Sequence, residues 1–335
     1  MKNYLITGGA GFIGSNFVKY LYEKETDIHV TVLDKLTYSG NMENLAEVID
    51  REDFEFVKGD ICDSGLVETL MEGVHVVVNF AAEVAVDRSI GNTQDFLMTD
   101  VIGVYVLLEQ ALKNRDTLEK FIQISTDEVY GQIREGSFYE TSELKPRNPY
   151  SASKTGGDRL AYSYFATYGL PVCITRASNT YGPFAYPEKV IPLFITNLYE
   201  GIPVPVFGDG SQIRDWLYVK DHCSGIYRVI KDGVNGEVYN IGGGQEVTNL
   251  DLTKRILSLM GKNESFIRYV SDRPGHDLRY SLNTEKLQAL GWQPQYDISS
   301  GLSQTVDWYV NHVDYWKKLR AGMDERYFKG FWNEK

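Results

Sequence analysis

Short apolar runs alternate with longer segments of helical periodicity through the first half of the chain. The strand-like runs lie at Asn3–Thr7, His29–Leu33, Phe54–Val57, Val74–Phe80, Lys120–Ile124 and Pro171–Thr175. Between them, apolar residues recur at helical spacing in Gly14–Glu23, Thr93–Lys113 and Pro149–Tyr168. Because the strand-like runs are continuously apolar, both faces of the sheet should be covered. The pattern therefore predicts an α/β fold with a doubly wound parallel sheet between two layers of helices.

The pattern changes after residue 176, where Pro and Gly become frequent through residue 210. A strand-like run follows at Glu237–Ile241, and helical spacing returns at Asn249–Met260 and Gly301–Val313. Dense Pro and Gly indicate loops with short elements, which suit a smaller mixed α/β lobe that binds a substrate. We predict a nucleotide-binding domain at residues 1–177, to which the chain returns around 214–243 and 301–320, a substrate lobe at 178–213 and 244–300, and a tail at 321–335.

Composition narrows the possible partners. The chain has 335 residues and a formal net charge of -12, which is unfavourable for binding nucleic acid or an anionic membrane. No apolar run reaches the roughly 18 residues of a membrane span, and no basic and apolar leader precedes the first strand-like run. The three cysteines and five histidines show neither metal-ligand spacing nor a disulfide framework. We therefore expect a cytoplasmic protein without a metal.

A glycine motif joins the first predicted strand to the first predicted helix. Gly8, Gly11 and Gly14 have the spacing G-x2-G-x2-G, and Phe12 and Ile13 lie inside it. Such glycines allow a tight turn and a close approach of the backbone to a diphosphate, which the positive end of the helix attracts. In this position the motif predicts a Rossmann domain that binds a dinucleotide.

An acidic residue at the end of the second strand indicates which dinucleotide binds. Asp34 can accept hydrogen bonds from a ribose 2′-OH and would repel a 2′-phosphate, so NAD is favoured, while the adjacent Lys35 leaves room for NADP. Further cofactor contacts are expected near the ends of the following strands and in two neighbouring segments, at Lys35, Thr37, Asp60, Ile61, Phe80, Ala81, Ala82 and Thr99.

The helix predicted at Pro149–Tyr168 begins with a tyrosine and a lysine four residues apart, Tyr150 and Lys154. Residues at i and i+4 share a helix face, and a nearby ammonium lowers the pKa of a tyrosine from about 10 toward neutrality. Two other Tyr-x3-Lys pairs occur, but only this one follows the strand that ends at Thr126. We therefore expect Tyr150 to act as a base on a hydroxyl whose carbon loses a hydride.

Two adjacent carboxylates, Asp127 and Glu128, follow Thr126 directly. Loss of water next to a newly formed ketone needs a base for the acidic α-proton and an acid for the departing hydroxyl. Two carboxyl groups can divide these roles when their environments separate their pKa values. The alternative is a pair of solvated loop residues.

Together these motifs resemble the extended short-chain dehydrogenase/reductase family and, within it, the nucleotide-sugar 4,6-dehydratases. The resemblance covers nearly the whole chain and includes residues 34–40, 86–90, 126–131, 187–192, 214–219 and 273–277. It implies an NAD-dependent hydro-lyase with dTDP-glucose as substrate, paired as a homodimer through the helices at Thr93–Lys113 and Pro149–Tyr168.

The resemblance also implies an order of events. Tyr150, helped by Thr126, takes the proton of the 4-OH while hydride passes from C4 to NAD, with Lys154 beside it. Glu128 then takes the C5 proton, Asp127 protonates the C6 hydroxyl, and hydride returns to C6. NAD would thus be regenerated in every cycle and stay tightly bound.

The substrate lobe should supply contacts to a nucleoside diphosphate. Arg214 and Arg273 are candidates for the diphosphate, because a guanidinium fork binds phosphate through two hydrogen bonds. The resemblance adds contacts to the sugar, ribose or base at Val84, Thr126, Asn179, Glu188, Lys189, Asn249 and His276, with Asn179 also beside the cofactor.

The chain departs from the family pattern beside the expected sugar pocket. Val84 and Ala85 replace a Ser-His pair that usually follows Ala-Ala-Glu, and Thr180 stands where Asn is common. The lost hydrogen bonds and the free volume at Ala85 suit a bulkier group such as a 2-acetamido substituent. A dehydratase for UDP-N-acetylglucosamine or UDP-glucose is therefore one alternative to the dTDP-glucose enzyme.

Two other classes of function use the same fold. An NAD-dependent UDP-sugar 4-epimerase or decarboxylase would also need Tyr150 and Lys154, but Asp127 and Glu128 argue against it. A non-catalytic NAD-binding regulator would be expected to lack Tyr150, Lys154 or Thr126, and all three are present.

Overall fold

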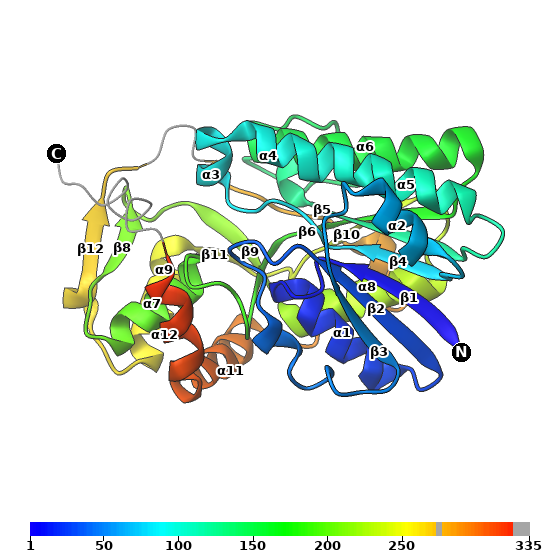
Figure 1. Cartoon of the computed structure of the whole chain (residues 1–335). Coiled ribbons are helices and arrows are strands. Elements are labelled where there is room, and N and C mark those ends of the chain that lie inside the picture. The colour runs from blue at the N-terminus through cyan, green and yellow to red at the C-terminus, as the bar shows by residue number, and fades with distance from the viewer. Residues whose placement is uncertain (273–276, 324–335) are drawn as a thin grey trace.

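A parallel seven-stranded sheet forms the centre of the computed structural model, which describes residues 1–272 and 277–323 (Figure 1). In spatial order its strands are β10 (Val238–Ile241), β6 (Val172–Ala177), β5 (Lys120–Thr126), β4 (Val76–Asn79), β1 (Lys2–Thr7), β2 (Ile28–Asp34) and β3 (Phe54–Lys58). All neighbours in this sheet are parallel. The predicted doubly wound α/β fold is confirmed.

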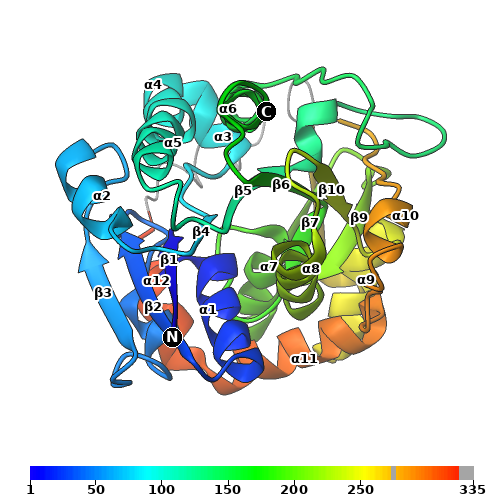
Figure 2. The same cartoon turned by 90° about the vertical axis from the view of Figure 1, so that its right-hand side faces the viewer.

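Helices cover both faces of the sheet (Figure 2). One layer contains α1 (Phe12–Lys24) and α8 (Val219–Asp232), and the other contains α2 (Ser64–Met71), α5 (Val104–Lys113) and α6 (Pro149–Tyr168). Each layer encloses its own apolar cluster with the sheet. Burial on both faces is the reason why the strands are continuously apolar in sequence.

The segment predicted as one helix at residues 93–113 has a wider turn in its middle. It consists of α4 (Thr93–Leu97), the π-helical η2 (Met98–Gly103) and α5. Helical periodicity predicts the continuous path of this segment but does not identify the π turn within it. Such turns are frequent at functional sites.

A second lobe follows the sheet and appears at the left of Figure 1. Its strands form a three-stranded sheet of β7 (Asn179–Tyr181), β9 (Ile213–Tyr218) and β11 (Glu246–Thr248), and a pair of β8 (Val204–Phe207) with β12 (Ile267–Val270). Its helices are α7 (Val190–Tyr199), α9 (Asn249–Leu259), α11 (Ile298–Asn311) and α12 (Val313–Ala321). A third apolar cluster unites them.

The shorter elements lie between these larger ones. They are η1 (Met42–Leu45), α3 (Val86–Gly91), η3 (Asp127–Tyr130), η4 (Glu264–Phe266) and α10 (Glu285–Gln288). Two segments predicted to return to the nucleotide-binding domain pack in different places. In the first, α8 packs on α1 and β10 joins the central sheet, whereas in the second α11 packs on α7 and α9. The division into domains stays a prediction.

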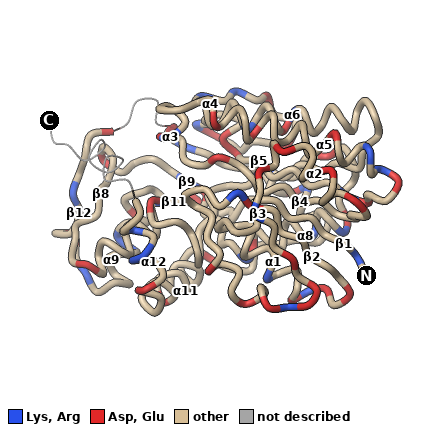
Figure 3. Tube along the Cα trace, in the orientation of Figure 1, with Lys and Arg blue, Asp and Glu red and all other residues tan. Residues whose placement is uncertain are grey.

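The order of strands in the central sheet reverses between β1 and β4. In doubly wound sheets, ligands bind beyond the carboxyl ends of the strands at such a reversal. Basic and acidic residues are interspersed along the described chain (Figure 3). Within residues 1–272 and 277–323, no helix is long and apolar enough to cross a membrane.

Candidate active site

The glycine loop between β1 and α1 shapes the floor of a pocket. Gly8 has a φ of +68°, and a Cβ atom there would lie 2.6 Å from the backbone nitrogen of Ala81. Any other residue would therefore both strain the turn and clash with the chain after β4. Gly11 is the N-cap of α1 and provides no side-chain hydrogen bond to the first turn. The N–H groups at this end of α1 can therefore donate hydrogen bonds to an anion such as a diphosphate.

Asp34, at the end of β2, lies beside this loop. Its two carboxylate oxygens accept hydrogen bonds from the backbone N–H of Ala10, at 2.9 Å, and of Leu36, at 2.8 Å. Burial raises the pKa of Asp34, and these two N–H donors partly oppose the rise. Next to it, the Lys35 ammonium pairs with Asp60 at 2.7 Å. A ribose bound here would contact the Asp34 carboxylate, which two backbone N–H groups hold in place, and Lys35, whose charge Asp60 neutralises.

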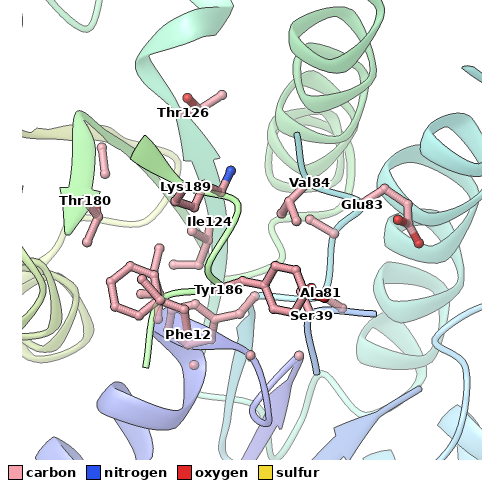
Figure 4. A pocket seen from close by; sticks show the side chains of 18 of the residues that line it. Phe12, Ser39, Ala81, Glu83, Val84, Ile124, Thr126, Thr180, Tyr186 and Lys189 are labelled. Atoms are coloured by element: carbon pink, nitrogen blue, oxygen red, sulfur yellow. The ribbon is translucent and has the colours of Figure 1, made fainter. Parts of the chain in front are cut away.

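The pocket runs from the glycine loop across the carboxyl ends of β1, β4 and β5 to the second lobe. All residues predicted for the cofactor line it: Gly8, Gly11, Phe12, Ile13, Gly14, Asp34, Lys35, Thr37, Asp60, Ile61, Phe80, Ala81, Ala82, Thr99, Tyr150, Lys154 and Asn179. So do Thr126, Asp127 and Glu128, and, among the residues predicted for the substrate, Val84, Glu188 and Lys189. Figure 4 shows side chains from both halves of the chain around it, with Phe12, Val84 and Thr126 from the first half and Thr180, Tyr186 and Lys189 from the second.

Local sequence fixes the start of α6 and thereby places Tyr150. Asn148 caps the helix by accepting a hydrogen bond from the backbone of Ser151, which reciprocates with its own side chain, and Pro149 occupies the first turn. Tyr150 also hydrogen-bonds with Thr126 at the end of β5. One turn further, the buried ammonium of Lys154 donates to the carbonyl oxygen of Ile124 at 2.9 Å.

The pKa of Tyr150 corrects one expectation from the sequence. Burial, followed by the carboxylates of Glu128, Asp100 and Asp127, raises it well above its ordinary value, and the hydrogen bond with Thr126 lowers it only in part. The expected lowering by Lys154 is therefore not achieved by the protein's own groups. Burial likewise lowers the pKa of Lys154, opposed by nearby carboxylates. Burial thus opposes the charged form of both side chains, so a further positive charge is needed to stabilise the tyrosinate.

Asp127 and Glu128 begin η3, directly after β5. Asp127 is almost fully buried, and Thr126 donates to its Oδ1 at 3.2 Å, while its Oδ2 has no hydrogen-bond partner among the described residues. Burial and then the charges of Glu128 and Asp215 raise the pKa of Asp127 well above its ordinary range. Glu128 is less buried and accepts a long hydrogen bond of 3.4 Å from Asn148. Burial beside other carboxylates thus favours the protonated form of Asp127, whereas Glu128 is only partly buried.

Backbone strain is concentrated around the pocket. In the described part of the chain, the non-glycine residues with positive φ are Leu36 (55°), Ala85 (78°) and Phe184 (69°). Each is adjacent in sequence to a residue that lines the pocket. Strained residues of this kind persist where the surroundings determine their conformation, which is typical of binding sites.

Two of the described residues that were predicted to bind the substrate, Arg214 and Asn249, do not line the pocket. Arg214 is buried, and its guanidinium donates to the backbone oxygens of Ile213, Asp277 and Leu278. Asn249 makes a 3.4 Å hydrogen bond to Gln212. Arg273 and His276 lie outside the described residues.

Sequence reasoning missed a cluster that joins the two lobes at the edge of the pocket. The hydroxyl of Tyr38 donates to Glu188 at 2.9 Å, and Arg88 pairs with the same carboxylate at 3.1 Å. The Arg88 guanidinium also lies 3.7 Å from the centre of the Tyr38 ring, and Tyr186 meets that ring edge-on. Tyr38 and Arg88 lie in the segments 34–40 and 86–90 that carry the family resemblance, but nothing in their spacing indicates a contact with Glu188, which is 150 and 100 positions away. Glu188 therefore holds the lobes together as well as lining the pocket.

The chain matches a protein-family model and is similar to several known proteins. Residues 5–305 match the family model described as GDP-mannose 4,6 dehydratase. The chain is 49% identical over 322 residues to a dTDP-glucose 4,6-dehydratase from Streptomyces niveus, which is 95% of each protein. It is 50% identical over 306 residues to the low-salt glycan biosynthesis protein Agl12 from Haloferax volcanii, covering 91% of this chain and 98% of that protein. Among solved structures it resembles DesIV, a dTDP-glucose 4,6-dehydratase from Streptomyces venezuelae with NAD and TYD bound, with a TM-score of 0.92, 47% identity, and 95% and 99% of the two chains covered.

Proposed function

The chain belongs to the GDP-mannose 4,6 dehydratase family, and we propose that it is an NAD-dependent hydro-lyase that converts dTDP-glucose to dTDP-4-keto-6-deoxyglucose. The observation that carries the proposal is the buried carboxyl group of Asp127 with Glu128 beside it, both next to Tyr150 in one pocket. Relatives named dTDP-glucose 4,6-dehydratase at almost half identity over nearly the full chain support the substrate.

The residues around the glycine loop fit NAD. The uncapped N-terminus of α1 suits the diphosphate, Asp34 suits a ribose, and Asp60 with Ile61 suits the adenine. Bound NAD supplies a hydride acceptor and donor together with a positive charge, so the net reaction needs no external oxidant. A positive charge next to Tyr150 is what the raised pKa of its phenol requires.

Tyr150 takes the proton of the sugar 4-OH, and Thr126 holds the phenol through their hydrogen bond. Once C4 is a ketone, the C5 proton is acidic and Glu128 removes it. Asp127, which keeps its proton because it is buried beside other carboxylates, gives that proton to the C6 hydroxyl as it leaves. The two carboxyl groups thus act as base and acid across the C5–C6 bond.

The rest of the nucleotide sugar extends toward the second lobe. Lys189 at the N-cap of α7, Glu188 and Asn179 line that end of the pocket, and Val84 lines it from the first domain. For Arg214 and Asn249 to reach the diphosphate, they have to exchange their present hydrogen bonds, which Arg214 makes to the backbone oxygens of Ile213, Asp277 and Leu278 and Asn249 makes to Gln212. We keep Arg273 and His276 as candidates from sequence alone.

Mass spectrometry of the product tests the proposal. The purified protein, with no cofactor added, is offered dTDP-glucose, UDP-glucose and UDP-N-acetylglucosamine in separate reactions. We expect loss of one water from dTDP-glucose, because Asp127 and Glu128 are placed for elimination and NAD is recycled. Preferential loss of water from UDP-N-acetylglucosamine would instead assign Val84 and Ala85 to a reshaped sugar pocket. An isomer without loss of water would place the protein with the 4-epimerases and overturn the proposal.

We also propose a homodimer formed by the helical layer of η2, α5 and α6. Large apolar side chains on this layer are exposed, among them Met98, Ile102, Tyr105 and Tyr162. Exposed apolar side chains gathered on one face are typical of an interface between subunits.

The free cysteines Cys62, Cys173 and Cys223 accord with a cytoplasmic location, which is part of the same proposal.

Light scattering of a surface variant tests the homodimer. Ile102→Lys buries a charge in the proposed interface and should convert the dimer to a monomer. Ile49→Lys is the matched control, since Ile49 is 40% exposed, close to the 42% of Ile102, but lies outside these helices. A wild-type protein that is already monomeric, or an Ile102→Lys protein that stays dimeric, would contradict the proposed interface.

A further inference from the structure

A buried carboxyl group outside the proposed reaction lies against the helix that carries the tyrosine and the lysine. Asp100 is on η2 and only 2% exposed. Its Oδ1 accepts a hydrogen bond from the backbone N–H of Glu83 at 3.3 Å, and its Oδ2 accepts one from the hydroxyl of Ser153 at 2.6 Å. One carboxylate thus ties the segment after β4, which lines the pocket, to the helix that carries Tyr150 and Lys154.

The close packing of η2 on α6 brings Asp100 to this place. A Cβ atom at Gly157 would clash with the backbone oxygen of Asp100, and one at Gly156 would lie 2.9 Å from Val101. Two consecutive glycines on α6 therefore allow the π turn to approach closely, although glycine weakens a helix interior. The π turn and the two glycines together place the side chain of Asp100 against α6.

The titratable groups around Asp100 come from α6 and from the segment after β4. Lys154 and Tyr150 face it from α6, and Glu83 faces it from the segment after β4. Asp158 also acts on Lys154 but is already paired with Arg176 at 2.8 Å and with Arg159 at 2.6 Å. Asp100 has no such arginine among its described contacts, so its charge acts on Lys154 and Tyr150 with less compensation.

We propose that Asp100 is a positioning residue that sets the charge states of Tyr150 and Lys154 while fixing α6 against the segment at Glu83. This inference rests on the proposed role of Tyr150 as the base. Burial raises the pKa of Asp100 to about 6, opposed by Lys154, Ser153 and the Glu83 N–H, so the group is mostly ionised above neutral pH. Its negative charge then raises the pKa of Tyr150 and opposes the lowering of the pKa of Lys154.

The variant Asp100→Asn keeps the shape of the side chain and removes its charge. Because that charge raises both pKa values, both should fall in the variant. The acid limb of the kcat profile reports ionisation of Tyr150, and the alkaline limb reports loss of the Lys154 ammonium. Both limbs should therefore move to lower pH, by about one unit. Ser153→Ala is the control, because it removes a hydrogen bond to Asp100 but keeps the carboxyl group. Since that hydrogen bond lowers the pKa of Asp100, the two variants are compared well above neutral pH, where Asp100 is ionised in Ser153→Ala.

A thermal measurement tests the charge of Asp100 without turnover. The folded-state pKa is raised above the unfolded value, so ionised Asp100 costs stability above about pH 6, and the cost disappears as the pH falls toward about 4. The difference in Tm between Asp100→Asn and wild type should therefore be more favourable to the variant at about pH 7.5 than at about pH 5.

The kcat profile and the thermal measurement distinguish failure of the role of Asp100 from failure of the proposed function. If both limbs of the kcat profile of Asp100→Asn stay at their wild-type pH while kcat falls, Asp100 has only a structural role. That result would overturn the proposal. A difference in Tm that does not change with pH would overturn it as well. If wild type fails to dehydrate any nucleotide sugar, the proposed function fails, while the thermal measurement still decides whether Asp100 carries a costly buried charge.

Discussion

Replacing Tyr150 with Phe should lower kcat for dTDP-glucose by at least about 10²-fold. The change removes one oxygen atom, the only group at this position that can take the 4-OH proton. The ring keeps its place at the start of α6, because the capping of that helix depends on Asn148 and Ser151. Oxidation at C4 is the first step and every later step depends on it, so formation of reduced nicotinamide and exchange of the C5 proton should slow by a similar factor.

The control for Tyr150→Phe is another tyrosine followed four residues later by lysine. Tyr227 precedes Lys231 at the same spacing, and its hydroxyl bonds to Glu25, away from the pocket. Tyr227→Phe should therefore leave kcat unchanged. Steady-state kinetics of both variants, with absorbance of the reduced nicotinamide in a single turnover, compares them. A near-normal kcat for Tyr150→Phe would reject its role as base.

The parts of the site that depend on local sequence could be predicted. The glycine turn is determined by residues within one βα unit, and the start of α6 is determined by its cap. The glycine turn and the start of α6 can therefore be recognised from sequence, as can Asp34 at the end of β2. The carboxyl ends of parallel strands meet at one edge of the sheet, so Thr126 and Asp127 could be placed beside the glycine loop without a structure.

The parts that depend on tertiary packing could not be predicted. The pairing of Glu188 with Tyr38 and Arg88 joins distant segments, and no periodicity encodes it. Arg214 is chemically suited to phosphate, yet its guanidinium bonds to backbone oxygens. The pKa of Tyr150 depends on burial and on every charge around it, whereas spacing indicates only that Lys154 shares its helix face.

Replacing Asp127 with Asn should separate elimination from oxidation. The variant keeps the hydrogen-bonding shape of the side chain but has no proton to give to the C6 hydroxyl. Tyr150 and Glu128 are unchanged, so oxidation at C4 and exchange of the C5 proton with solvent should continue. Loss of water should slow by at least about 10²-fold. Deuterium incorporation at C5 and the mass of the product measure the two steps separately.

Glu128→Gln is the matched change at the neighbouring carboxylate and should fail earlier. It should still allow oxidation at C4 but block exchange at C5, so the two variants stop on opposite sides of the same proton transfer. Rapid exchange in Glu128→Gln, or normal elimination in Asp127→Asn, would reverse or reject these roles. Stability gives an independent check, because the folded-state pKa of Asp127 is raised and its ionisation therefore opposes folding increasingly as the pH rises above its unfolded value. Asp127→Asn should thus gain stability relative to wild type with rising pH while it loses activity, as expected when a buried acid is retained for chemistry.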